Sequence, residues 1–574
     1  MTTLYELTRR HEVFFGDPND SENIFSYRTA HDYDVNSAFP QGIIDQLNSW
    51  GLSDYYVPLE FGGKLKGYDE LFHLIRLASR RDLTSAIGHG KTMLGAICVW
   101  IGGSRAQRQW LADAILCHKA TSLALTEQSH GSDISASHVL CNETPQGYRL
   151  NGEKYLINNA RRAASLTVFA RTAANNNARD FSIFLIDKTR LPEDALSYVP
   201  KLLTHGIKGA DISGVRFHNV PLPTSALVGK PGQGLEIMLC GFQLTRTLCT
   251  GLSCGAGESA LRLALRYAAE RQVYRAPLIK LANIRRRLAE AAADVLIADA
   301  VGLFSCRAIN VLPQQMSTIS AAAKAFVPTS IEDMVDGLVE VLGARAYLED
   351  DGEYGHFGKL QRDCRLISLF DGNTVINLQA LIVQLPALAR QRRRNGPTPD
   401  TGALLGTLFG LDEPLQALEP QRLKLSGKGQ DAIVQSLFSA TQQLSDVEGI
   451  PPAIAHKLNA QVRQVLNRLA QVDDFFLKQV PRKQISAQCF AMAELYTHIF
   501  AAACCIQSFI VSHRRMAAEW RDGTALSACL DRLNAAPLEA DDALLQRVQN
   551  CIAQDRLISF FPLPLAATRQ GATS

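Results

Sequence analysis

Apolar residues recur at helical spacing through most of the chain. In its first part, Leu71, Leu74 and Leu77 fall on one face of a helix. Spacing of three and four residues is typical of amphipathic helices that pack against a core. The pattern predicts a helical N-terminal domain over residues 1–118, interrupted by turn residues at 57–63.

Between residues 119 and 235 the pattern changes to short apolar runs separated by Gly, Asn and charged residues. The runs at 166–170 and 181–186 are short and bounded by turn residues, which is typical of strands. A glycine-rich segment at 227–234 closes the region and lacks the Gly-Lys-Ser/Thr ending of a phosphate-binding Walker loop. These features predict a compact middle β domain.

Helical spacing returns at residue 236 and continues to about residue 390. Charged residues step by four between positions 258 and 270 on an otherwise apolar helix, so most of that helix is expected to be buried. A further helix is expected over 317–326, with Pro328 as its break. Long apolar helices joined by short loops predict a helical bundle domain over 236–390.

Residues 391–399 contain three arginines, two prolines and a glycine, and this composition predicts a linker. The helical pattern that follows predicts an additional C-terminal helical domain over residues 400–574. This region shows no catalytic constellation, and its pattern favours packing or dimerisation over binding to a membrane or another partner. The chain is therefore expected to be a mainly helical α+β protein with a β domain in the middle.

Two apolar segments raise the question of a membrane. The segment 495–512 has no Asp, Glu, Lys or Arg over 18 residues, which is the lower length limit of a spanning helix. Its small residues, with His498 and Gln507, favour a buried helix of a bundle. The segment 404–418 leaves contact with a membrane surface open. Residues 1–18 carry charges and no apolar run, so a cytoplasmic location is predicted, with peripheral membrane contact left open.

Composition narrows the classes of function. Hydrophobic residues make up 47% and charged residues 20% of the 574 residues, as in globular proteins with large cores. The net charge of +3 gives no indication of nucleic-acid binding. The thirteen cysteines are expected to be reduced thiols. The thirteen histidines do not fall at metal-ligand spacing, so no metal is expected.

Candidate chemistry lies in the segment 369–376, where Asp371 precedes Gly372. A glycine lets a ligand approach the backbone closely, and a carboxylate beside it is well placed to act as a general base. An Asp-Gly step is also common in plain turns. The segment alone leaves both interpretations open.

Five segments carry recognisable motifs. They are the loop 125–133 (LTEQSHGSD), the strand 154–159 (KYLINN), the exit loop 227–234, the segment 270–274 (ERQVY) and the Phe-Asp-Gly step 370–372. Together, and in matching order over residues 40–390, they resemble the acyl-CoA dehydrogenase family. The additional C-terminal domain makes the chain similar to the larger members, the very-long-chain dehydrogenases and the acyl-CoA oxidases.

The resemblance implies FAD as cofactor and α,β-dehydrogenation of an acyl thioester, either acyl-CoA or an acyl chain on a carrier protein. A base removes the α-proton while the β-hydride passes to the flavin, and the resemblance assigns that base to Asp371. Some members place the base before the arginine that corresponds to Arg246, but Thr245 stands there and cannot serve. The residues expected to bind the cofactor are Leu125, Thr126, Gly131, Ser132, Leu156, Asn158, Arg271, Tyr274 and Asn373. Those expected to bind the substrate are Ser132, Phe242, Arg246 and Gly372.

The resemblance also implies partners. An electron-transfer flavoprotein is the usual electron acceptor, and an acyl carrier protein is a candidate carrier of the substrate. The chain is expected to form a homo-oligomer, with a dimer favoured. Arg271 would then face the pyrophosphate of a FAD that reaches across the subunit boundary.

Several positions depart from the family pattern. Asp371 is one methylene shorter than the usual Glu, and Asn158 replaces a Thr that would meet the flavin ring. Nitroalkane oxidases use an Asp base but carry an arginine seven residues later, where this chain has Leu378. Three alternatives therefore stay open: an acyl-CoA oxidase, a nitroalkane-oxidase-like enzyme, and a degenerate member that is a non-catalytic scaffold. The altered motifs predict a specialised acyl substrate.

Overall fold

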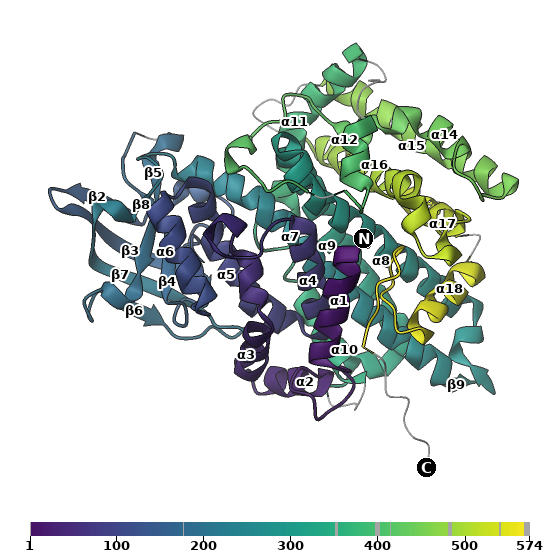
Figure 1. Ribbon diagram of the computed structural model, residues 1–574, viewed down its shortest axis with the longest axis horizontal. Coiled ribbons are helices and arrows are strands. Elements are labelled where there is room, and N and C mark those ends of the chain that lie inside the picture. Colours follow the sequence, from purple (N-terminus) through teal and green to yellow (C-terminus); the bar gives the residue numbers. More distant parts are fainter. Residues whose placement is uncertain are drawn as a thin grey trace.

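The computed structural model describes residues 2–175, 177–349, 354–395, 402–413, 415–479, 485–538 and 541–566. Helices from both ends of the chain share one continuous core, and a β-sheet domain lies at one side of them (Figure 1). The expected class, a mainly helical α+β protein with a β domain in the middle of the sequence, is confirmed.

The N-terminal region is helical. Its helices are α1 (Thr2–Phe15), α2 (Tyr27–Val35), α3 (Gln41–Trp50), α4 (Tyr68–Arg81), α5 (Leu83–Gly102) and α6 (Arg105–Leu116). The Asp82 side chain caps α5 by accepting hydrogen bonds from the backbone N–H groups of Thr84 and Ser85. The capped helix packs on both the sheet and the bundle, and it forms part of the wall between them.

The middle domain is a mixed sheet with the strand order β6-β7-β3-β2-β4-β5-β8, and β1 runs parallel to β4. The strands are β1 (Thr121–Ala124), β2 (Leu140–Thr144), β3 (Gly147–Asn158), β4 (Ser165–Arg171), β5 (Phe181–Asp187), β6 (Leu196–Val199), β7 (Ile212–Leu222) and β8 (Leu227–Val228). Successive side chains alternate between faces. Val168 belongs to a small core within the β domain, whereas Phe169 belongs to the large core shared with the helices.

The central bundle follows the sheet. Its helices are α7 (Gly234–Glu270), α8 (Ala282–Val311), α9 (Met316–Leu342), α10 (His356–Cys364) and α11 (Thr374–Asn395). The predicted break at Pro328 is wrong, because α9 runs through this proline. Proline inside a helix costs about 3 kcal/mol. Val327 and Ile331 beside it are buried, and burial of each such side chain contributes about 1.5–3 kcal/mol, which offsets that cost.

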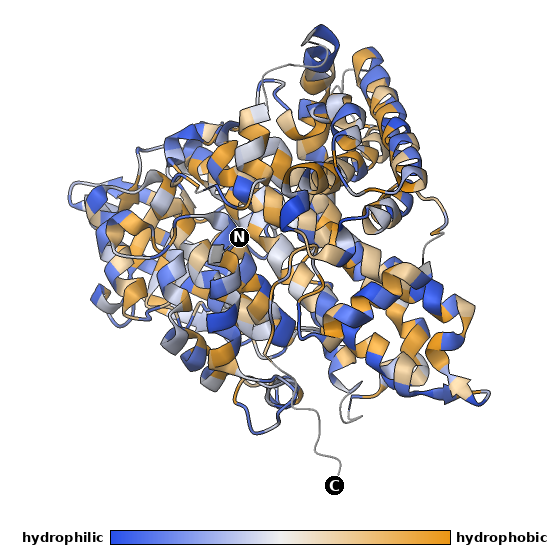
Figure 2. Cartoon of the chain, turned by 45° about the vertical axis from the view of Figure 1, so that its right-hand side comes forward, coloured by the Kyte–Doolittle hydropathy of each residue, from blue (hydrophilic) through white to orange (hydrophobic). Residues whose placement is uncertain are grey.

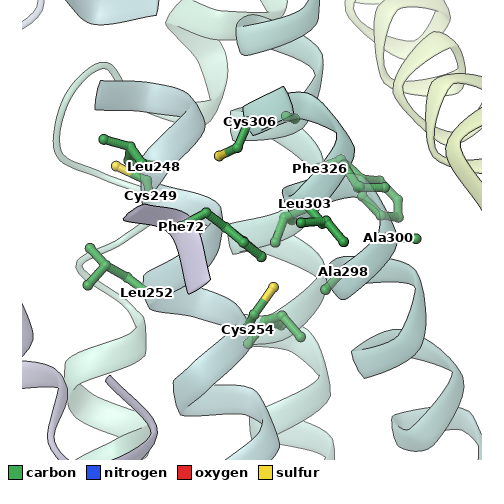
Figure 3. Packing of buried hydrophobic residues seen from close by; sticks show 14 of the residues in the cluster. Phe72, Leu248, Cys249, Leu252, Cys254, Ala298, Ala300, Leu303, Cys306 and Phe326 are labelled. Carbon is green, nitrogen blue, oxygen red and sulfur yellow. The ribbon is translucent and has the colours of Figure 1, made fainter. Parts of the chain in front are cut away.

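A glycine lets a helix of the N-terminal region approach the central bundle closely. At Gly302 of α8, an added Cβ would stand 2.5 Å from Cε2 of Phe72 on α4. Figure 3 shows the Phe72 side chain between Leu252 and Leu303 in this core. The missing side chain therefore lets α4 pack directly against α8.

The C-terminal helices cover one side of the bundle, and α16 packs on α8, α9 and α11 (Figure 1). They are α12 (Gly402–Phe409), α13 (Ala432–Gln435), α14 (Leu437–Ser445), α15 (Pro452–Lys478), α16 (Ala487–Ser512), α17 (Thr524–Leu533) and α18 (Asp541–Ala553). Hydrophobic and hydrophilic residues alternate around these helices (Figure 2), as expected where one face of each helix is buried.

The linker predicted from residue 391 is wrong at its start, because α11 continues to Asn395. Arg392 is 3% exposed and pairs with Asp431 and Asp473 of the C-terminal region. A buried guanidinium needs such partners, so this arginine ties the two helical regions together. The rest of the predicted linker, 396–399, lies outside the described residues.

The two apolar segments are covered by protein. By length and composition, the helix Ala487–Arg515 could span a membrane, and so could α8 and α9 taken as one bent span. However, 67% of the most apolar window of Ala487–Arg515 is buried inside the protein, which confirms the buried helix predicted at 495–512. α12 buries Leu405, Leu408 and Phe409, and contact of the segment 404–418 with a membrane surface stays a prediction.

Candidate active site

A cavity of about 710 Å³ lies between the sheet and the bundle. One wall comes from the β domain, through the loop after β1 and the end of β3. The other wall comes from α5, α7 and the turn before α11. The volume falls within the ~300–1,000 Å³ of typical small-molecule sites. This cavity is therefore the candidate site.

The turn before α11 presents Asp371 to the cavity. Asp371 has a φ of 55° and Gly372 a φ of 90°, so both adopt the left-handed conformation that Gly and Asp tolerate best. The buried Asn377 fixes the turn, because its Nδ2 donates to the carbonyl oxygens of Gly372 and Asn373 at 2.8 and 2.9 Å. The Asn373 Oδ1 accepts from the Ile376 N–H at 2.9 Å and caps the helix.

Arg246 of α7 supports the same turn from behind. Its Nε donates to the backbone carbonyl oxygen of Asp371 at 2.8 Å, and its guanidinium lies 5.1 Å from the Phe242 ring centre. Burial lowers the pKa of Arg246, although the neighbouring Asp371 opposes this shift. The sequence predicted a substrate contact for this arginine. The structure places it on the cavity wall, where it also holds Asp371 in position.

Gly372 leaves the space that this guanidinium fills. A Cβ at residue 372 would stand 2.7 Å from Arg246 Nη2, so we expect Gly372→Ala to displace the guanidinium and shift Asp371. Because a misplacement near 1 Å can cost about a hundredfold, reduction of a bound flavin by substrate should slow between about tenfold and a hundredfold. Stopped-flow absorbance measures this rate. Gly449→Ala is the control, since Gly449 has a φ of 86° but no atom within 4 Å of its added Cβ. Equal rates in the two variants would contradict the packing argument.

The Asp371 side chain is 10% exposed, and Lys91 and Cys249 each approach one of its carboxylate oxygens. Lys91 Nζ of α5 lies 3.6 Å from its Oδ1, and the Cys249 thiol of α7 donates to its Oδ2 at 3.8 Å. Burial, followed by the charge of Asp371, raises the pKa of Cys249 to about 12. Cys249 therefore stays a neutral thiol and leaves the carboxylate as the group that can take up a proton.

The buried carboxylate of Glu127 holds the loop 125–139 in place on the β-domain wall. Glu127 accepts hydrogen bonds from Ser137 Oγ at 2.8 Å, from the N–H groups of His138 and Val139 at 2.7 and 3.1 Å, and from Lys154 Nζ at 2.8 Å. These contacts close the loop 125–139 onto β3. Burial would raise the pKa of Glu127, but Lys154 and the hydrogen bonds hold it at about 2.

This carboxylate should make the loop sensitive to acid. The folded-state pKa of about 2 lies below the ordinary value of 4.5. Its stabilisation is therefore complete above pH 4.5 and is lost as pH falls from 4.5 towards 2.

We expect Glu127→Gln to weaken the loop by about 1–3 kcal/mol at neutral pH, so that limited proteolysis cuts within 125–139 faster than in the wild type. Cleavage at the wild-type rate would contradict this role, and Glu143→Gln, at an exposed position of β2, is the control.

The lining of the cavity fits the flavin that the sequence resemblance implies. Leu156 has a φ of 58° and is 53% exposed, so it presents an apolar surface to the cavity. Asn158 Oδ1 is buried and has no hydrogen-bond partner among the described residues. A buried unpaired acceptor calls for a donor, and a ring N–H of a flavin is such a donor. Thr126 and Ser132 add polar groups on the same wall.

The cavity brings together most of the predicted site residues. Those that line it are Leu125, Thr126, Gly131, Ser132, Leu156, Asn158, Phe242, Arg246, Asp371, Gly372 and Asn373. Arg271 and Tyr274 are elsewhere, on the exposed hairpin of β9 (Gln272–Val273) and β10 (Ala276–Pro277). Tyr274 is 90% exposed. A contact of these two residues with the FAD of a second subunit stays a prediction.

Sequence reasoning missed four residues of this site. Lys91 and Cys249 lie beside the Asp371 carboxylate, Asn377 fixes the turn of Asp371, and Glu127 closes the loop 125–139. Only Glu127 had a signal, because it stands inside the recognised loop opposite Lys154. The residue at the nitroalkane-oxidase arginine position, Leu378, is buried at 8% exposure, whereas Lys91 places a cation 3.6 Å from Asp371 Oδ1.

Two family models match the chain. Residues 122–220 match the model described as acyl-CoA dehydrogenase, middle domain, and residues 232–385 match acyl-CoA dehydrogenase, C-terminal domain. The human mitochondrial short-chain specific acyl-CoA dehydrogenase is 26% identical over 392 residues, which cover 66% of this chain and 91% of that protein. Both matched ranges contribute residues to the cavity.

Solved structures show the same fold. An acyl-CoA dehydrogenase from Bacillus anthracis, complexed with FAD, superposes with a TM-score of 0.69 and 17% identity, and covers 96% of this chain and 91% of its own. A prolyl acyl carrier protein oxidase superposes with a TM-score of 0.60 and 17% identity, and covers 66% of this chain and 98% of its own. The first of these likenesses extends over the C-terminal helices as well.

Proposed function

This chain belongs to the acyl-CoA dehydrogenase family of flavoprotein oxidoreductases, which use FAD, and on that premise we propose that it dehydrogenates an acyl thioester with Asp371 as the base. The observation that carries the proposal is the position of this carboxylate. It lies on the helical wall of the cavity, 10% exposed, while the wall that fits a flavin lies on the β domain.

The two walls of the cavity contribute different groups to the reaction. Removal of hydrogen from Cα and Cβ needs a base for the α-proton and a hydride acceptor on the opposite face of the substrate. Bound FAD supplies the hydride acceptor. Asp371 Oδ1 or Oδ2 takes the α-proton, Arg246 and Asn377 hold its backbone, and the Cys249 thiol steadies its second oxygen.

The carrier and the assembly follow from the same premise. The substrate arrives as acyl-CoA or on an acyl carrier protein. The fold shared with the prolyl acyl carrier protein oxidase supports the acyl carrier protein as a candidate carrier. An electron-transfer flavoprotein reoxidises the cofactor. Two copies assemble so that the hairpin with Arg271 and Tyr274 meets the FAD of the other copy. The thirteen free cysteines support a cytoplasmic location.

Anaerobic mixing tests this function. The purified protein should be yellow, an acyl thioester should bleach the flavin absorbance, and mass spectrometry should find a product lighter by two hydrogens. Absence of flavin, or a spectrum that no acyl thioester changes, would show a non-catalytic family member. Bleaching by a nitroalkane alone would favour the nitroalkane-oxidase alternative, and rapid hydrogen peroxide release in air would favour an acyl-CoA oxidase.

A further inference from the structure

A second cavity, of about 50 Å³, lies beyond Asp371 between α4, α5 and α7. It shares Lys91, Phe370 and Asp371 with the large cavity, so it begins where the base is. A water molecule occupies about 30 Å³ of liquid, so the space admits a group of a few non-hydrogen atoms. An acyl chain that passes Asp371 would end there.

The wall of this small cavity is mostly apolar but contains an unpaired hydroxyl. Apolar residues such as Ile75, Leu248 and Leu252 form most of the lining. Thr245 also lines it, is 5% exposed, and has a buried Oγ1 with no hydrogen-bond partner among the described residues. Leaving such a group unpaired costs about 1–3 kcal/mol. A polar atom of a ligand would remove this cost.

Besides Thr245 and Asp371, Lys91 also brings a polar group to the small cavity. Its ammonium lies 3.6 Å from Asp371 Oδ1 and 3.9 Å from the centre of the Phe370 ring. The first distance exceeds a normal hydrogen bond, and the described residues give Lys91 no hydrogen bond. Its side chain is only 14% exposed, so few water molecules can reach the ammonium.

The charges around the base are unbalanced. Among the described residues, Lys91, Arg246 and the fully buried Lys324 lie near the Asp371 carboxylate; Lys324 donates to the Ile367 carbonyl and lies 5.8 Å from the Phe370 ring centre. Burial lowers the pKa of Lys324 and of Arg246, and the negative charge of Asp371 opposes both shifts. Buried cations need opposite charge nearby. A ligand with a negative group at the Lys91 end of the cavity would supply it, whereas a cationic aminoacyl group would be repelled.

We propose that the small cavity binds a carboxylate at the far end of a short acyl chain, with Lys91 and Thr245 as its recognition residues. The inference rests on the proposed function and specifies its substrate as a short ω-carboxyacyl thioester. Lys91 pairs with the carboxylate, Thr245 Oγ1 donates to it, and the apolar lining packs on the methylene groups. Both residues determine specificity, and Asp371 remains the base.

Binding of unreactive analogues tests the specificity. The ligands are two pantetheine thioethers of equal length that end in a carboxylate or in a methyl group, since pantetheine is the arm common to CoA and carrier proteins. Calorimetry on the FAD-loaded protein should find the carboxylate ligand bound at least about tenfold more tightly. Lys91→Met should abolish this preference, and Thr245→Val should reduce it. The exposed Lys119→Met is the matched control and should keep it.

Three results would overturn the inference. The first is equal affinity of the wild type for the two ligands, and the second is a higher affinity for the methyl ligand. The third is an equal loss of affinity for both ligands in Lys91→Met, which would mean that Lys91 only holds Asp371 in position. The proposed function fails separately. If neutral acyl thioesters bleach the flavin but no carboxylate preference exists, only this inference fails. If the preference exists but no acyl thioester bleaches the flavin, the dehydrogenase function fails and the anion site stands.

Discussion

Asp371→Asn should leave the FAD content unchanged and slow flavin reduction by acyl thioesters by about 10²–10⁴-fold, the usual contribution of a general base. The amide has nearly the same size, so the turn held by Arg246 and Asn377 should persist. Neither atom of the amide can take up the α-proton. Anaerobic stopped-flow absorbance gives the rate, and the flavin-to-protein ratio gives the cofactor content.

A surface variant separates this effect from a general loss of charge. Asp113→Asn removes an exposed carboxylate of α6 and should reduce flavin at the wild-type rate. Asp371→Glu adds the missing methylene within a cavity shaped for Asp, so its rate should lie between those of the wild type and Asp371→Asn. Wild-type reduction by Asp371→Asn would show that another group takes the proton.

Arg76→Met should destabilise the protein by about 3–5 kcal/mol, the cost of leaving buried carboxylates without their partner. Arg76 of α4 is fully buried and donates to Asp299 of α8 at 2.5 Å and to Glu258 of α7 at 2.8 Å. It also donates to the Ile558 carbonyl near the C-terminus at 3.0 Å. One side chain thus joins the N-terminal helices, the bundle and the C-terminal segment.

The midpoint of urea unfolding measures this loss. Arg28→Met is the control, because Arg28 is 58% exposed and pairs with Asp32 only on the surface, where ion pairs contribute at most about 1 kcal/mol. An Arg76→Met midpoint equal to that of the control would contradict the role of Arg76. It would also mean that Arg262, the other partner of Glu258, balances the charge alone.

The sequence predicted those parts of the site that depend on local chemistry. Asp371 and Gly372 stand in one turn, and the loop 125–133 contains its polar residues within a few positions. Lys91 was not predictable, because its distance to Asp371 depends on how α5 packs against the sheet and bundle. From the sequence, Thr245 was considered only as a possible base. Its hydroxyl has no partner because apolar residues of α4 and α5 surround it, which depends on the packing of the helices.

The difference between local signals and long-range packing also explains the two wrong predictions about the fold. Pro328 and the arginines after residue 390 are local signals for a break and a linker. In the structure, burial around α9 outweighs the proline, and Asp431 and Asp473 from the C-terminal region bury Arg392. The burial of α16 was predictable, because its small and polar residues are part of its own sequence.

Removal of the α-proton by Asp371 is the central claim, and an isotope measurement tests it most directly. Flavin reduction should be compared for an acyl thioester with hydrogen or deuterium at Cα, in the wild type and in Asp371→Asn. We predict slower reduction by the deuterated substrate in the wild type and almost no reduction by either substrate in the variant. Equal wild-type rates for the two substrates, together with wild-type reduction by Asp371→Asn, would contradict it.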